Sequence, residues 1–93
     1  MENEREMQFY LFRKYLVEKG YKEFTASGLD STVGQYITAV EKVLEEERMS
    51  IEEFNRRINE ICFFYDIGGA KESIGERGHR TVINALKRYR EFI

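Results

Sequence analysis

The stretch that decides the fold is HRTVINALKRYREFI, the last fifteen residues, from His79 to Ile93. On a helical wheel, its apolar side chains fall within about 120° of one another; they are Val82, Ala85, Leu86, Tyr89, Phe92 and Ile93. The polar residues gather on the opposite side; they are Arg77, Arg80, Asn84, Lys87, Arg88 and Glu91. The pattern predicts a helix over 79–93 that closes a core with one face and presents a mostly basic surface with the other.

Three earlier segments have the same amphipathic spacing and predict helices at about 5–19, 31–47 and 51–66. Each has an apolar stripe suited to packing against neighbouring helices. Ninety-three residues, of which 42% are hydrophobic, suffice for one core. We therefore predict an all-α fold, a compact four-helix bundle that forms a single domain over 1–93.

Start and stop signals support these helix bounds. The second helix has an N-cap candidate at Asp30 or Ser31. The third begins with Ser50-Ile51-Glu52-Glu53, a capping box in which Glu53 reaches back to Ser50. Gly20 stands where a left-handed residue is expected after the first helix. The glycine-rich segment 68–78 is predicted to be a flexible link.

Composition excludes several classes of protein. No apolar run approaches the roughly 20 residues of a membrane span, so no membrane partner is expected. The polar start MENERE does not resemble a signal peptide. Cys62 is the only cysteine, which excludes an internal disulfide and fits a reducing compartment. We therefore expect a cytoplasmic protein.

Catalytic signals are absent from the sequence pattern. His79 is the only histidine, so a metal site that needs two imidazoles is excluded. Cys62 lies on the core-facing stripe of its helix, whereas His79 follows the glycine-rich link. The glycines of that link do not have the spacing of a phosphate-binding loop. We expect no enzyme activity, no catalytic residues, no metal site and no cofactor.

The charge is unevenly distributed along the chain. The formal net charge is −2, but residues 71–93 carry six Lys and Arg against three Asp and Glu. The C-terminal part is therefore positive and the remainder negative, and this polarity directs attention to the polar side of the 79–93 helix.

The helices together resemble the N-terminal core-binding (SAM-like) domain of phage integrases and other tyrosine recombinases. The first carries the F-x-x-[YF]-L pattern at Phe12, Tyr15 and Leu16, and the second carries T-x-x-x-Y-x-x-x-[LV] at Thr32, Tyr36 and Val40. The fourth matches that family at Thr81, Val82, Ala85, Leu86, Lys87, Tyr89, Phe92 and Ile93. The resemblance covers nearly the whole chain. It departs from the family in its longer, glycine-rich third link and in its acidic balance.

The resemblance implies a DNA-binding domain that contacts double-stranded DNA mainly through backbone phosphates. In that family the second and fourth helices face the DNA, which gives the candidate DNA-binding residues Thr32, Gln35, Arg80, Thr81, Asn84, Lys87 and Arg88. We expect this chain to lack the recombinase catalytic domain, with its Arg, His-x-x-Arg and Tyr. The domain is therefore not expected to recombine DNA by itself, and recombinase protomers are candidate partners.

Two alternatives remain open at the level of sequence. The chain could be a helical protein–protein interaction module in which Tyr10, Val17 and Phe63, apolar residues off the core stripes, form a docking patch. It could also be an accessory domain of another DNA-acting enzyme, such as a restriction endonuclease.

Overall fold

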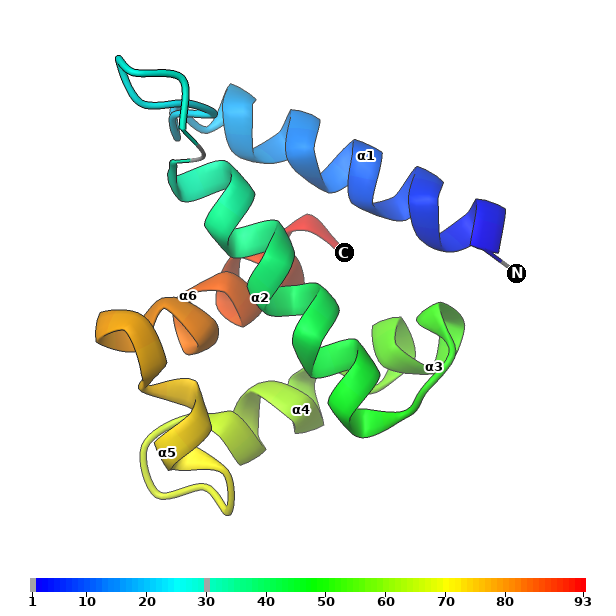
Figure 1. The fold of residues 1–93 in the computed structure, drawn as a ribbon. Coiled ribbons are helices and arrows are strands. Elements are labelled where there is room, and N and C mark those ends of the chain that lie inside the picture. Colours follow the sequence, from blue (N-terminus) through cyan, green and yellow to red (C-terminus); the bar gives the residue numbers. More distant parts are fainter. Residues whose placement is uncertain (1, 30) are drawn as a thin grey trace.

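The computed structural model describes residues 2–29 and 31–93, and the side chains of 4–29 and 31–93. The helices are α1 (Glu2–Glu18), α2 (Thr32–Glu47), α3 (Ile51–Arg56), α4 (Ile58–Tyr65), α5 (Glu72–Gly75) and α6 (Arg77–Phe92) (Figure 1). The all-α prediction is confirmed. The described residues form six helices rather than four, because Arg57 interrupts the predicted 51–66 helix and a short helix lies within the predicted 68–78 link.

Helix α6 lies at the centre of the fold and does not simply cover one side of the core. It packs against α1, α2, α4 and α5, and α1 lies across the outside of the molecule (Figure 1). Because neighbours cover α6 on several sides, its buried face is wider than the predicted stripe. Ile83, at the edge of that stripe, is 1% exposed, whereas Ile93 follows the last helical residue and is 49% exposed.

An aromatic cluster fills the core around Tyr89, which is fully buried. Its ring centroid lies 5.1 Å from that of Phe12 in an edge-on contact and 5.5 Å from that of Phe54. The Tyr89 hydroxyl donates a hydrogen bond to the Asn55 side-chain oxygen. Burial raises the pKa of this phenol above its ordinary value. The cluster joins α1, α3 and α6 in one core.

The end of α1 agrees with the sequence prediction. Gly20 has a φ of 100°, so it occupies the left-handed region that glycine adopts without strain. The Tyr21 N–H donates to the Leu16 carbonyl at 3.1 Å, and the Gly20 N–H donates to the Val17 carbonyl at 3.0 Å. These two bonds form a Schellman motif that ends the helix.

The predicted caps are only partly present. The Ser50 hydroxyl accepts a hydrogen bond from the Glu53 N–H at 3.2 Å, but the Glu53 carboxylate pairs with Arg57 at 3.4 Å. The box is therefore half closed. The N-cap of α2 is Ser31, whose side chain makes no capping hydrogen bond. Asp30, the other candidate, lies outside the described residues.

The helical conformation of α6 begins later than the predicted residue 79. Gly78, His79 and Arg80 have φ values of 63°, 57° and 69°, so the chain makes a left-handed turn within the first residues of α6. The Thr81 hydroxyl donates to the Gly78 carbonyl and closes this turn. Regular α-helical geometry therefore starts at Thr81.

Candidate nucleic-acid interface

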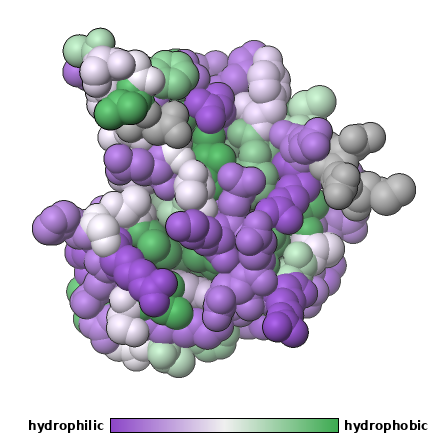
Figure 2. Space-filling model, in the orientation of Figure 1, coloured by the Kyte–Doolittle hydropathy of each residue, from purple (hydrophilic) through white to green (hydrophobic). Residues whose placement is uncertain are grey.

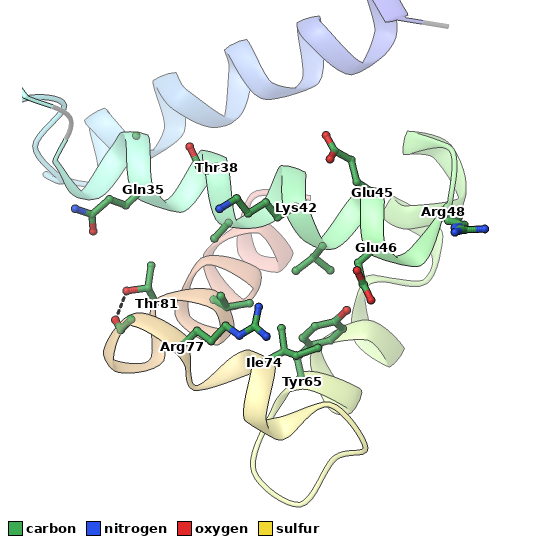
Figure 3. A pocket seen from close by; sticks show the side chains of 15 residues that line it. Gln35, Thr38, Lys42, Glu45, Glu46, Arg48, Tyr65, Ile74, Arg77 and Thr81 are labelled. Atoms are coloured by element: carbon green, nitrogen blue, oxygen red, sulfur yellow. Dashed lines mark hydrogen bonds between the residues drawn. The ribbon is translucent and has the colours of Figure 1, made fainter.

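A groove of about 820 Å³ runs between α2 and the segment that joins α5 to α6. Apolar side chains line part of it, namely Ala39, Val43, Tyr65, Ile74 and Val82. Polar and charged side chains line the rest and include Gln35, Thr38, Lys42, Arg77 and Thr81 (Figure 3). On the same face, Figure 2 shows apolar surface in a hollow surrounded by hydrophilic residues. A polar rim over an apolar floor is the usual form of a binding groove.

The polar rim on the α2 side follows from helical spacing. Gln35, Thr38 and Lys42 are separated by three and four residues, so they fall on the same helix face. Thr81 reaches the groove from the first regular turn of α6, after the left-handed turn has redirected the chain. The structure thus brings together Gln35 and Thr81, two of the predicted DNA-binding residues.

Three rim residues were not among the predicted candidates, namely Thr38, Lys42 and Arg77. The position of Thr38 and Lys42 could have been predicted from the sequence, because both follow Gln35 at helical spacing and so share its helix face. Arg77 could not be placed from sequence, because it precedes the left-handed turn and its direction depends on how α5 docks.

The two ends of the groove differ in charge. Lys42 and Arg77 lie on opposite sides of it, one on α2 and one at the start of α6 (Figure 3). Among the described side chains neither forms an ion pair. Gln35 and Thr81 line one end of the groove, and Glu45, Glu46 and Arg48 line the other, with Lys42 and Arg77 between them (Figure 3). An anionic ligand is therefore favoured between Lys42 and Arg77, on the side away from the two glutamates.

Two of the predicted basic residues of α6 share one acidic partner. Arg80 Nη2 lies 3.5 Å from Asp66 Oδ1, and Lys87 Nζ lies 3.2 Å from Asp66 Oδ2. The Ile67 backbone N–H also donates to this carboxylate, and together with Lys87 it holds the pKa of Asp66 below its usual range. The basic face predicted for the helix is therefore partly neutralised within the domain.

Arg88 is held on the other edge of α6. Its Nη1 donates to the Tyr21 hydroxyl at 3.3 Å, and its Nη2 pairs with Glu91 at 3.0 Å. The Nε atom is buried and has no hydrogen-bond partner among the described residues. Tyr21 in turn packs against Tyr36 of α2, with ring centroids 5.5 Å apart. Arg88 thus connects the α1–α2 link to α6, and these contacts limit the freedom of the Arg88 side chain to bind a ligand.

The last two predicted residues are half-buried. Thr32 is the first residue of α2, and Asn84 lies on α6 one turn after Thr81. Five of the seven predicted residues therefore divide among the groove, the Asp66 contact and the Arg88 contact, whereas Thr32 and Asn84 belong to none of these. The seven do not form one continuous surface of free side chains.

A polar network borders the acidic end of the groove. Glu47 accepts hydrogen bonds from the Tyr65 hydroxyl, at 2.7 Å, and from the Lys71 ammonium. The Lys71 ammonium also lies 5.6 Å from the centre of the Tyr65 ring. Burial alone would raise the pKa of Glu47, but the two hydrogen bonds outweigh it and hold that pKa below its ordinary value. The network ties α5 to α2 and α4.

We expect Glu47→Gln to lower the free energy of unfolding by about 1–2 kcal/mol at pH 7, because it removes a charged acceptor. A carboxyl whose pKa is lowered in the folded state stabilises the fold above its unfolded pKa, and this contribution is lost as the pH falls through the folded pKa. The difference between variant and parent should therefore shrink below about pH 4. Urea unfolding between pH 3 and pH 7 measures it. Glu46→Gln, an exposed neighbour, is the control, and an equal loss in both variants would contradict the assignment.

Cys62 lies in the core, as expected from the sequence, whereas His79 does not begin the last helix. The Cys62 thiol is buried, donates weakly to the Leu86 carbonyl at 3.5 Å, and has a pKa raised by burial. His79 is exposed in the left-handed turn. Within the described side chains, His, Cys, Asp and Glu nowhere gather in groups of three or more that could hold a metal ion. In the part of the chain that the structure describes, no helix combines the length and apolar character needed to cross a bilayer.

Comparison with known proteins identifies no relative: no family model, curated protein or solved structure matches the chain.

Proposed function

We propose that the chain is a DNA-binding domain of the integrase core-binding type, which contacts backbone phosphates through α2 and α6. The observation that supports this most directly is the groove rim, where polar side chains of the two helices meet around Lys42 and Arg77. Both cations are solvent-exposed and have no ion-pair partner among the described side chains. They are therefore available to a phosphate without loss of an internal contact.

The rim chemistry suits a phosphodiester backbone. Hydroxyl and amide groups, such as those of Thr81 and Gln35, donate hydrogen bonds to phosphate oxygens and fix the register of a protein on DNA. Lysine and arginine neutralise phosphate charge and release counterions, which makes the binding sensitive to salt. Such contacts carry little sequence information, so we propose weak and largely non-specific binding by the domain alone.

The basic edge of α6 extends this surface. Arg80 and Lys87 pair with Asp66 through side chains that are each about a third exposed, at 37%, 29% and 34%. Exposed ion pairs contribute little to stability and exchange partners readily. A phosphate can therefore replace the Asp66 carboxylate as the partner of both cations.

The order of the helices also supports the family assignment. The helical interruption at Arg57 spans a single residue, so α3 and α4 together occupy the place of one helix in a four-helix order. In the same scheme α5 belongs to the link before the last helix. The domain then corresponds to the integrase core-binding pattern of four successive helical segments, with Thr32 and Thr81 at the starts of the second and fourth.

We expect the double variant Lys42→Gln/Arg77→Gln to bind a labelled DNA duplex roughly tenfold more weakly at 50 mM salt, because two phosphate contacts are removed. The slope of log affinity against log salt should fall by about 1.8. Fluorescence anisotropy at 50–200 mM salt measures both quantities. Arg56→Gln, on the exposed side of α3, removes one positive charge away from the groove and is the control.

Two outcomes would contradict this function. One is the absence of binding to either duplex or single-stranded DNA by the parent protein at 50 mM salt. The other is an equal loss of binding free energy per charge removed in the control variant, which would indicate only a response to net charge.

A protein-interaction module remains the second candidate, because α1 has an apolar outer face. Its residues Met7, Tyr10, Leu11 and Val17 are 57%, 56%, 43% and 42% exposed. Tyr10 and Val17 of the predicted docking patch belong to this face, whereas Phe63 lies on α4. Concentration-dependent sedimentation together with indifference to DNA would favour this candidate.

A further inference from the structure

An exposed aromatic ring stands on the outer side of α4. Phe63, which the sequence pattern places off the core stripe, is 71% exposed, and Ile67 is 69% exposed. The ring of Phe64 contacts that of Phe63 edge-on, with centroids 6.4 Å apart. The buried stripe of α4 consists of Ile58, Ile61, Cys62 and Tyr65. Phe63 therefore adds little to the core, and its ring is open to solvent.

Two cations of α6 reach the end of α4 that carries this ring. Asp66 follows Phe63 by three residues, at the C-terminal end of the same helix, and it pairs with both Arg80 and Lys87. An open aromatic ring and a pair of cations held at the same end of a helix suit single-stranded nucleic acids, because the cations can hold the backbone while the ring stacks on a base. An uncharged apolar protein surface would be recognised through the ring and Ile67 alone, without use of the two cations.

We propose that Phe63 is a stacking platform for an unpaired base, so that the domain prefers single-stranded DNA to a fully paired duplex. A base inside a duplex already has both faces covered by its neighbours, whereas an unpaired base has a face free to stack. Arg80 and Lys87 hold the flanking phosphates in place of the Asp66 carboxylate. This proposal rests on the proposed DNA-binding function and adds the form of DNA that is bound.

The chain has no tryptophan, which allows a direct test. In the Phe63→Trp variant, a stacked base should quench the indole emission when a 12-nucleotide single strand is added, while the matching duplex should leave it nearly unchanged. Tyr10→Trp places an indole on α1, at a site that is 56% exposed, and serves as the matched control. Equal quenching of both variants, or quenching of neither by the single strand, would overturn the proposal.

Affinity gives an independent measure. Phe63→Ala should weaken single-strand binding about 5- to 100-fold, as for the loss of one stacked base, and should change duplex binding less than twofold. Phe63→Leu keeps the apolar bulk but removes the ring, so it should lose nearly as much, and Phe63→Tyr should restore the affinity. Because the side chain is exposed, circular dichroism should show that all three variants fold.

The outcomes separate the two proposals. If neither the single strand nor the duplex binds at 50 mM salt, the DNA-binding function itself fails. If the duplex binds as well as the single strand and Phe63→Ala changes neither, only the stacking proposal fails. Self-association that Phe63→Ala abolishes, with DNA affinity unchanged, would assign this surface to a protein contact and would also overturn it.

Discussion

Tyr89→Ala is expected to lower the free energy of unfolding by about 3–5 kcal/mol, the usual cost of truncating a buried aromatic residue. Natural domains have only about 5–15 kcal/mol in total, so this single change should leave a large unfolded population. The side chain is fully buried and contacts rings from α1 and α3 as well as Phe92 of its own helix. Its removal leaves a cavity at the point where these helices meet.

Urea unfolding followed by circular dichroism measures this loss. Tyr89→Phe is the matched control, because it keeps the ring and removes only the hydroxyl that donates to Asn55. That variant should lose about 0.5–1.5 kcal/mol. A cost of less than about 2 kcal/mol for Tyr89→Ala would show that the aromatic cluster does not hold the fold.

Gly75→Ala is expected to cost about 3 kcal/mol, although it adds a single methyl group. Gly75 is buried at the end of α5, and a Cβ atom there would overlap the backbone carbonyl oxygen of Tyr65. The obstacle is backbone and not the end of a flexible side chain, so either α4 or α5 must move. Movement of α5 would also break the contact of Lys71 with Glu47.

Gly28→Ala provides the comparison for this effect. Gly28 has a φ of 86°, but an added Cβ would have no neighbour within 4 Å. It should therefore show only the backbone cost of a left-handed residue, about 1–2 kcal/mol. Thermal and urea unfolding of the two variants measure the difference. If Gly75→Ala proves no more costly than Gly28→Ala, then α5 is not packed against α4 as described.

The groove shows which parts of a site can be predicted without the tertiary structure. Helical spacing alone places Gln35 and Lys42 on the same face of α2 and places Phe63 off the core stripe of its helix. The partners of Arg80 and Lys87 do not follow from it, because Asp66 is distant in sequence and meets them only when α4 packs against α6. The basic residues predicted from the helical wheel are therefore present on α6, but Asp66 partly neutralises them in the folded protein.

The sequence by itself determined the helical class, the end of α1 at Gly20 and most of the buried stripes, because these depend on local spacing and backbone preference. Only the tertiary structure decided that α6 is the central helix, that the chain turns left-handed at 78–80, and which cations remain free beside the groove. These features depend on contacts between residues far apart in the chain. The packing of α2, α4 and α5 around α6 determines these features, so they cannot be predicted from local sequence patterns.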